Sequence, residues 1–320
     1  MEYKILNNTD LKVSSASLGT DVYGTVLNKA QSYELLDTYT DLGGNIIDTA
    51  LVYANWIPGE KSLSEKLIGS WMEERKNRHE IIISTKGAHP EIMTISRLSR
   101  EEILGDIDKS LKHLKTDYID IYWLHRDDEN LPVGPIMETL GEIVKSGKAR
   151  YIGMSNWTYR RIDEANKYAR EHNLPQIIGS QIQYSAAIPN LDNIDPTLVL
   201  MDDNEYRYFS ETKMNVFAYA SQAKGFFSKL DNGGKENLSD KARERYLNDE
   251  TLSRYEKIKE IAMQTGHTVG EIAIAVVANN PNFPTIPIVG CKNTVQLKES
   301  MAGSNLKIPE ELLSFLHGTK

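Results

Sequence analysis

The feature that most constrains the fold of this chain is a regular alternation of short β-branched runs and longer helical patterns. Strands that alternate with helices pair in parallel and are joined by right-handed crossovers. Eight such units in about 300 residues predict a closed (β/α)₈ barrel, with an open doubly wound sheet as the competing architecture. The predicted strands are Ser15–Gly19, Asn45–Thr49, Ile81–Thr85, Tyr118–Leu124, Ala149–Ser155, Gln176–Gln181, Asn215–Ala220 and Thr285–Val289.

Two segments fall outside this repeat. Residues 2–13 are predicted to form a small hairpin, Glu2–Leu6 with Leu11–Val13, that closes the floor of the barrel. Residues 221–250 are polar and are predicted to be a long loop of the kind that often serves as a lid or binding loop. We therefore expect one domain over residues 1–320, a barrel with an N-terminal β-hairpin and extra C-terminal helices.

Two helix starts are marked by a capping box, in which two side chains satisfy each other's unpaired backbone N–H groups. Ser62 and Glu65 have the required spacing, and Ser99 and Glu102 repeat it. Each pair is expected to begin a helix on the outside of the barrel.

Charge and composition exclude several classes of protein. The chain has 37 Lys and Arg against 45 Asp and Glu, a net charge of -8, and lacks the basic patch of a nucleic-acid-binding protein. Its longest apolar stretch, Ile272–Ala278, is far below the roughly 20 residues that span a bilayer, and the N-terminus lacks an apolar signal core. We expect a cytoplasmic protein with neither a nucleic-acid nor a membrane partner.

Metal and disulfide chemistry are not expected. Cys291 is the only cysteine, which excludes an internal disulfide and a zinc site built from several cysteines. The seven histidines are scattered and show no ligand spacing.

Four polar residues are predicted to meet at one rim, because active sites of such barrels lie at the carboxyl ends of the strands. Asp48, Lys86 and His125 end the second, third and fourth strands, and Tyr53 lies in the loop after Asp48. A neighbouring ammonium lowers the pKa of a phenol, and a carboxylate can neutralise that ammonium. Such a tyrosine can act as general acid toward a carbonyl, whose oxygen a histidine can orient.

Each of these residues also has a structural explanation when it is taken singly. Asp48 can cap a helix, Tyr53 is one of 16 tyrosines, Lys86 can be solvated, and His125 can be a satisfied core residue. A lysine at a strand end also suits a barrel lyase or isomerase that forms a Schiff base. Their convergence on one rim favours the proton-transfer set.

Five runs resemble the aldo-keto reductase superfamily, in family order and over nearly the whole chain. They are GGNIIDTALVY (43–53), IIISTKG (81–87), YIDIYWLHRDD (118–128), YIGMSN (151–156) and IPIVGCKNTVQLKES (286–300). The resemblance implies a (β/α)₈ barrel that reduces carbonyl compounds with NAD(P)H. It also implies that Tyr53 donates the proton, Lys86 tunes its pKa, Asp48 supports Lys86, and His125 positions the carbonyl. Some members are cofactor-binding regulatory subunits, which is the alternative function.

The resemblance further implies a set of cofactor-binding residues. Matches to the carboxamide binders and to the aromatic residue that stacks on nicotinamide are Ser155, Asn156, Gln181 and Tyr219. The loop that closes over the pyrophosphate contains Ser221, Gln222 and Lys224, although the usual Ser-Pro-Leu-Gly pattern reads Ala-Ser-Gln-Ala-Lys-Gly here. Matches after the last strand are Gly290, Lys292, Gln296, Glu299 and Ser300.

The nucleotide preference rests on Lys292, which can pair with an adenosine 2′-phosphate and so favours NADP(H) over NAD(H). The family usually has Asn in place of Ser300 and often Arg near Gln296, and these departures leave NADH open.

The substrate pocket is expected in the loops after the strands, where aromatic and hydrogen-bonding side chains occur together. The candidates are Asp21, Tyr23, Trp56, Arg126 and Trp157. Such a lining suits a small-molecule carbonyl with several hydroxyl groups, for example a sugar or its keto derivative, better than a steroid or a long aliphatic aldehyde. The oligomeric state is left open.

Overall fold

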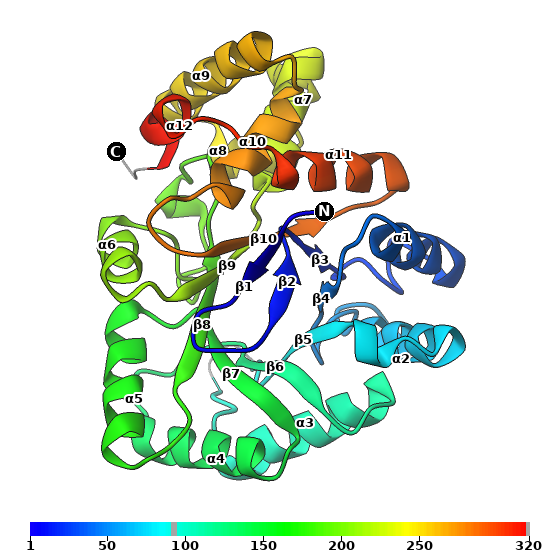
Figure 1. Cartoon of the computed structure of the whole chain (residues 1–320), viewed down its shortest axis with the longest axis vertical. Helices are drawn as coiled ribbons and strands as arrows, with labels where there is room; N and C mark the ends of the chain where they lie inside the picture. The colour runs from blue at the N-terminus through cyan, green and yellow to red at the C-terminus, as the bar shows by residue number, and fades with distance from the viewer. Residues whose placement is uncertain (91–94, 318–320) are drawn as a thin grey trace.

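A computed structural model describes residues 1–90 and 95–317, and its centre is a closed barrel of eight parallel strands within those residues (Figure 1). The order around the barrel is β10-β3-β4-β5-β6-β7-β8-β9, and β10 closes the ring by pairing with both β3 and β9. This closure confirms the predicted barrel over the open sheet. The strands are β3 Ser17–Gly19, β4 Ile46–Asp48, β5 Ile82–Gly87, β6 Ile119–Leu124, β7 Ala149–Ser155, β8 Ile177–Gln183, β9 Asn215–Tyr219 and β10 Thr285–Gly290.

The described helices lie outside this barrel, and those at the top of the view form a group of their own beside it (Figure 1). They are α1 Lys29–Asp41, α2 Leu63–Arg75, α3 Arg100–Leu114, α4 Val133–Lys145, α5 Tyr159–Glu171, α6 Asp203–Thr212, α7 Phe226–Gly233, α8 Asp240–Tyr246, α9 Asp249–Thr265, α10 Val269–Ala278, α11 Thr294–Asn305 and α12 Glu310–His317. The main apolar core lies between the strands and these helices, as the near-continuous burial of a parallel sheet requires.

The predicted hairpin is present as β1 (Tyr3–Ile5) paired with β2 (Lys12–Ser14). Leu6, Leu11 and Val13 of this segment belong to one buried cluster with residues of the barrel interior, among them Trp123 and Phe217. The hairpin therefore plugs the amino-terminal end of the barrel and leaves the opposite rim for the site.

Close packing inside the barrel orients Trp123. Its ring lies edge-on to Phe217, with 4.9 Å between ring centroids. A Cβ atom on Gly153 would lie 2.3 Å from the ring of Trp123, so only glycine allows this approach. The indole N–H is thereby aimed at Ser84, which contacts the site described below.

The expectation of a long polar loop over residues 221–250 is wrong. The segment contains α7 and α8, and Phe226, Phe227 and Tyr246 are buried in a second apolar cluster beneath α9 and α10. The apolar residues of this segment recur at helical spacing and so face one side of each short helix. This spacing is hard to recognise in the sequence because most of the intervening residues are polar.

Of the two predicted capping boxes, one forms. Ser99 and Glu102 cap α3 reciprocally. Ser62 precedes α2 with a left-handed backbone, and its hydroxyl donates to the carbonyl oxygen of Leu51 instead. Glu65 is fully buried, where it accepts from the Thr85 hydroxyl at 2.7 Å, so that prediction is wrong because tertiary partners took both side chains.

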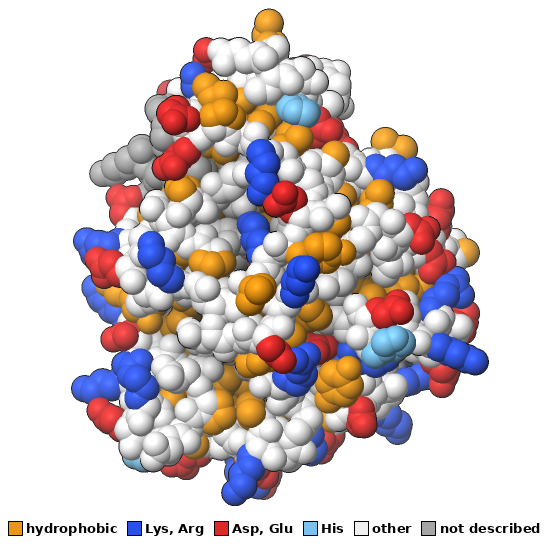
Figure 2. All heavy atoms as spheres, in the orientation of Figure 1, with side chains coloured by type: hydrophobic (Ala, Val, Ile, Leu, Met, Phe, Trp, Pro, Cys, Tyr) orange, Lys and Arg blue, Asp and Glu red, His pale blue; other side chains and the backbone are white. Residues whose placement is uncertain are grey.

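The face closed by the hairpin carries Lys and Arg interspersed with Asp and Glu, and its exposed apolar side chains are scattered (Figure 2). Through residues 1–90 and 95–317, no single helix has the length and apolar character needed to cross a membrane. Only α9 and α10 taken together meet that test, and a bend of 103° separates them.

Glu205 gives the fold a specific pH dependence. One of its oxygens accepts the backbone N–H of Tyr159 at the start of α5, while Oε2 is buried without a partner in the described part of the chain. Burial raises the pKa of Glu205 to about 7. The folded state therefore holds a proton that the unfolded chain releases near its ordinary pKa, so this residue makes stability fall as pH rises between about 4.5 and 7.

We expect Glu205→Gln to stabilise the protein at pH 8 by about 2–3 kcal/mol, and much less at pH 5, because the amide keeps the acceptor and carries no charge. Chemical unfolding at both pH values measures this difference. Glu211→Gln, on the exposed side of the same helix, is the control. A pH dependence identical in wild type and Glu205→Gln would contradict the expectation.

Candidate active site

The carboxyl ends of β4 and β5 bring Asp48, Lys86 and Tyr53 together. The ammonium of Lys86 donates to Asp48 Oδ1 at 2.5 Å, to the carbonyl oxygen of Thr49 at 2.7 Å and to the hydroxyl of Tyr53 at 3.1 Å. Asp48 and Lys86 are buried, whereas Tyr53 is half-buried. The buried ion pair therefore presents the phenol of Tyr53 to the barrel mouth.

Asp48 is held by further donors from the barrel interior that sequence reasoning missed. Its Oδ2 accepts from the Ser84 hydroxyl at 2.8 Å and from Gln181 Nε2 at 2.9 Å, and Trp123 Nε1 in turn donates to Ser84. Ser84 stands two residues before Lys86, so the alternation of a strand places both on the inner face. The two-residue alternation of side chains along a strand could therefore have identified Ser84 from the sequence.

The pKa of Tyr53 is raised in the structure, whereas the sequence predicted that Lys86 would lower it. Burial raises the pKa of Tyr53 to about 12, and the charge of Lys86 offsets only part of that rise. For Lys86, burial opposes the charge, but the Asp48 carboxylate and Tyr53 outweigh it and raise the pKa. At neutral pH Tyr53 thus holds its proton and Lys86 its charge, which is the state a proton donor needs.

His125 completes the group from the end of β6. Its ring lies edge-on to Tyr53, with 6.2 Å between centroids. Burial, followed by the charge of Lys86, lowers the pKa of His125 well below its usual value, so the ring is neutral. Nδ1 is buried and has no hydrogen-bond partner in the segments that the structure describes, which favours the tautomer with the proton on Nε2. His125 can then donate to a carbonyl oxygen.

His89 is a second imidazole at the mouth that sequence reasoning missed. Its ring lies 4.6 Å from that of His125, centroid to centroid. Nδ1 of His89 lies 2.8 Å from the carbonyl oxygen of Pro90, so it must carry the proton, and Nε2 is left as an acceptor.

The predicted carboxamide binders lie side by side at the ends of β7 and β8. Asn156 is fully engaged: its amide N–H₂ donates to Ser155 and its oxygen accepts from the Tyr219 hydroxyl at 2.7 Å. Two groups beside Asn156 have no hydrogen-bond partner among the described residues: the hydroxyl proton of Ser155 and Oε1 of Gln181. One free donor and one free acceptor fit the carbonyl and amino groups of a carboxamide, with Tyr219 and Ser155 both held in place by Asn156.

The loop after β9 has an unusual backbone. Ala220, Ala223 and Lys224 have φ of 51°, 47° and 58°, a left-handed conformation that costs energy for residues other than glycine. Left-handed residues can turn backbone N–H groups toward an anion, but here the N–H groups of Ala223 and Gly225 donate to carbonyl oxygens within the loop. Burial, followed by the charge of Arg245, lowers the pKa of Lys224, while the carboxylate of Asp21 opposes the change.

Arg245 is a further residue that sequence reasoning missed, because it belongs to the segment expected to be a loop. Its Nε is buried without a partner in the described part of the molecule. With Lys224 it fits a phosphate group. Ser221 donates to the carbonyl oxygen of Ile288 at 2.8 Å, and Gln222 donates to Ser300 at 2.8 Å, so this loop is fixed against β10 and α11.

The predicted adenine-end residues gather at β10 and the start of α11. Gln296 accepts the backbone N–H of Lys292 at 2.9 Å, and the Lys292 side chain is exposed. Glu299 faces away and accepts from Thr268 at 2.8 Å, and Gly290 lies beside the carboxylate of Asp21. Asp21, predicted as a substrate residue, thus lies beside the end of β10, and its charge acts on both Lys224 and Lys86.

Two of the predicted substrate residues are corrected by the structure. Tyr23 and Trp157 have no exposed surface, since both pack into the main core, and Trp157 donates its indole N–H to the carbonyl oxygen of Arg126. Trp56 is 60% exposed and lies edge-on to Tyr53, with 6.3 Å between centroids. Trp56 and Arg126 remain as candidates for substrate contact.

Cys291 is buried, and burial raises its pKa to about 11, so its thiol is unreactive. Apart from residues outside the described ranges, no group of three or more His, Cys, Asp or Glu could hold a metal ion.

The fold and the rim define a class: a (β/α)₈ barrel protein whose Tyr, Lys, Asp and His can deliver a proton to a carbonyl oxygen. Comparison with known proteins makes this specific. Residues 16–316 match the Aldo/keto reductase family, and the chain belongs to it. The family match establishes an NAD(P)H-dependent oxidoreductase that acts generally on carbonyl compounds.

Three relatives illustrate the range of the family. An uncharacterized oxidoreductase of Bacillus subtilis is 28% identical over 99% of this chain and 95% of its own length. A norsolorinic acid reductase of Aspergillus flavus is 28% identical over 97% of this chain and 78% of its length. A probable voltage-gated potassium channel subunit beta of Arabidopsis thaliana is 29% identical over 94% of this chain and 90% of its length.

Proposed function

We propose that this protein reduces a hydroxylated aldehyde or ketone, such as a sugar-derived carbonyl compound, with NADP(H) as the preferred cofactor. The observation that carries the proposal is the hydrogen-bonded series from Asp48 through Lys86 to the hydroxyl of Tyr53 at the barrel mouth. The nicotinamide supplies a hydride to the carbonyl carbon when it is bound.

The residues of the chain then handle one proton and one developing charge. His125 donates a hydrogen bond from Nε2 to the carbonyl oxygen and orients it. Tyr53 transfers its proton to that oxygen as the carbonyl group is reduced to an alcohol. The ammonium of Lys86 then stabilises the phenolate that remains on Tyr53. Asp48 keeps Lys86 charged in its buried position, so the set acts as one unit.

The groups around the mouth favour a substrate with hydroxyl groups. The exposed ring of Trp56 offers an apolar face beside Tyr53, while Nε2 of His89 offers an acceptor and Arg126 offers donors. Hydroxyl groups both donate and accept, and can use all of these.

The preference for NADP(H) rests on the exposed cation of Lys292 next to α11. We expect Lys292→Ala to raise the Kd for NADPH by about 10-fold, and the Kd for NADH by less than 2-fold, because only NADPH carries the 2′-phosphate. Fluorescence titration measures both values. Lys298→Ala, on α11 itself, is the control. Equal changes for the two nucleotides would contradict a role for Lys292 in this preference.

The test of the function is single-turnover oxidation of bound NADPH, with a sugar-derived aldehyde and an aromatic aldehyde compared in parallel. We expect oxidation with both classes and faster turnover of the hydroxylated compound. Turnover of aromatic aldehydes alone would overturn the sugar-derived substrate and leave the reductase intact. Tight NADPH binding without oxidation above background would overturn the reductase itself.

A regulatory, cofactor-binding subunit is the second candidate, and the similarity to a probable potassium channel subunit beta supports it. The complete set of Tyr53, Lys86, Asp48 and His125 favours catalysis, and the same single-turnover experiment distinguishes the two.

A further inference from the structure

Arg126 is a half-buried cation at the barrel mouth, and within the described residues it has no carboxylate at ion-pair distance. Its Nη1 donates to the carbonyl oxygen of His125 at 2.9 Å. Nε is buried without a hydrogen-bond partner, and across residues 1–90 and 95–317 no carboxylate forms an ion pair with the guanidinium. An unpaired buried charge of this kind is costly and calls for an explanation.

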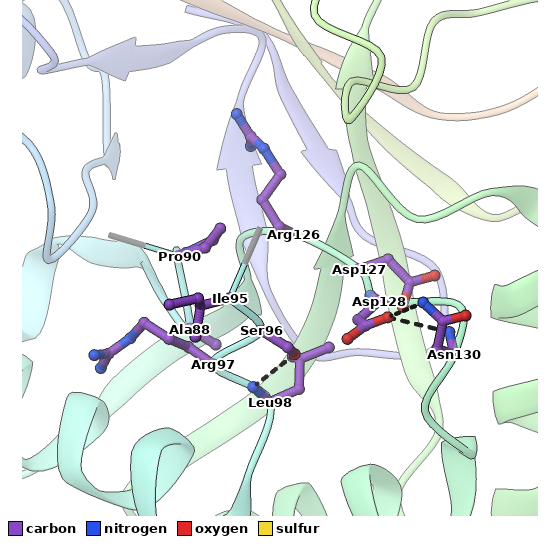
Figure 3. A pocket seen from close by; sticks show the side chains of 10 residues that line it. All are labelled: Ala88, Pro90, Ile95, Ser96, Arg97, Leu98, Arg126, Asp127, Asp128 and Asn130. Atoms are coloured by element: carbon purple, nitrogen blue, oxygen red, sulfur yellow. Dashed lines mark hydrogen bonds between the residues drawn. The ribbon is translucent and has the colours of Figure 1, made fainter. Parts of the chain in front are cut away.

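The carboxylates nearest in sequence are committed elsewhere. Asp127 forms an ion pair with Arg161 of α5. Nε of Arg161 donates to Oδ2 at 3.0 Å, and Nη2 donates to Oδ1 at 3.3 Å. Asp128 accepts from both the backbone and the side chain of Asn130. Arg126 borders a pocket of about 220 Å³ with these residues, but its side chain extends away from them (Figure 3).

The guanidinium instead acts electrostatically on the predicted active site. Burial lowers the pKa of Arg126, and Tyr219, the carboxylate of Asp195 and Tyr53 oppose the change, although Asp195 forms no ion pair with the guanidinium. The charge of Arg126 also contributes to the lowered pKa of His125. Arg126 therefore belongs to the same mouth as the proton donor.

The phosphates of the cofactor are on another side of that mouth. Their predicted partners follow β9 and β10, and β6, which carries Arg126, stands four strands from β10 in the closed ring, directly across the barrel. Lys224 and Arg245 already supply cations on the β9 side. The cofactor therefore leaves Arg126 without an anion.

We propose that Arg126 binds an anionic group of the substrate, a carboxylate or a phosphate, so that the protein acts on carbonyl compounds that carry a negative charge. The proposal rests on the proposed function and specifies its substrate class. A guanidinium pairs with either anion through two parallel hydrogen bonds, and among the described residues only the carbonyl oxygen of His125 accepts from this one, through Nη1. Sugar acids and sugar phosphates would satisfy Arg126 and the hydroxyl-binding groups together.

The test compares charged carbonyl compounds with neutral counterparts that share the same carbonyl group. Succinic semialdehyde is paired with its methyl ester, and glyceraldehyde 3-phosphate with glyceraldehyde, which separates carboxylate from phosphate. The variants are Arg126→Met, which keeps an unbranched apolar stem without the charge, and Arg126→Lys, which keeps the charge. Arg160→Met, on the exposed side of α5, is the control.

We expect Arg126→Met to lower the preference of kcat/KM for the charged compound by about 10- to 100-fold, mostly through KM, with the neutral compound changed less than about 3-fold. Arg126→Lys should restore part of the preference. An equal loss for charged and neutral compounds, or a wild-type preference for the neutral ones, would overturn the proposal.

Calorimetric binding of succinate and of inorganic phosphate to the cofactor-loaded protein keeps this test separate from catalysis. Binding that Arg126→Met abolishes would support the anion site even if no carbonyl compound were reduced, and only the proposed function would then fail. Absence of binding to the wild type would overturn the anion site while reduction of neutral carbonyls left the proposed function standing.

Discussion

Replacing Tyr53 with phenylalanine is expected to lower kcat for carbonyl reduction by about 10²–10⁴-fold, the usual contribution of a general acid. The phenyl ring keeps the edge-on contacts with Trp56 and His125, so the site should retain its shape. Only the hydroxyl is lost, which is the group that Lys86 contacts at 3.1 Å. Steady-state reduction of a reactive aldehyde measures the change.

The affinity for NADPH and the midpoint of thermal unfolding serve as internal controls for Tyr53→Phe, and both should stay near the wild-type values. Tyr33→Phe, on α1, where the hydroxyl donates to Glu74 of α2, tests whether loss of any hydroxyl has the same effect. Reduction at close to the wild-type rate would exclude Tyr53 as the proton donor and leave His125 as the other candidate.

Lys86→Met is expected to lower kcat by about 10²–10³-fold, because the phenolate of Tyr53 would form without its stabilising charge. The pKa of Tyr53, already about 12 with Lys86 present, would rise further and weaken the acid. The substitution should also lower the free energy of unfolding by about 3–5 kcal/mol, since Asp48 would be left as an unpaired buried charge.

The double variant Asp48→Asn/Lys86→Met separates these two effects. It removes both charges, while asparagine can still accept from Ser84 and Gln181. We expect most of the stability to return and the activity to stay low. If activity returned together with stability, the loss in Lys86→Met would reflect misfolding, and Lys86 would have no direct part in proton transfer.

The sequence predicted the barrel because its signal is repeated along the whole chain. Each strand is buried on both faces, so its apolar run is visible without any knowledge of its neighbours. The predicted Tyr118–Leu124 and Ala149–Ser155 correspond to β6 (Ile119–Leu124) and β7 (Ala149–Ser155) within a residue. The four predicted catalytic residues converge for the same reason, since parallel strands bring their carboxyl ends to one rim.

Predictions from single side chains were weaker, because tertiary partners compete for the same polar groups. Ser99 caps its helix as predicted, while Ser62 has the same local pattern and donates to Leu51 instead. Trp157 was expected at the substrate and is buried in the core. Neither outcome is encoded within the few residues around the side chain.

The sequence by itself determined the order of strands, the residues at their carboxyl ends, and hence the kind of chemistry at the rim. The tertiary structure alone decided the electrostatics of that rim. Burial raises the pKa of Tyr53 beyond what Lys86 offsets, Asp127 is paired with Arg161, and Arg126 forms no ion pair with a described residue. These depend on which groups share one buried space, and segments distant in the chain create that space only after folding.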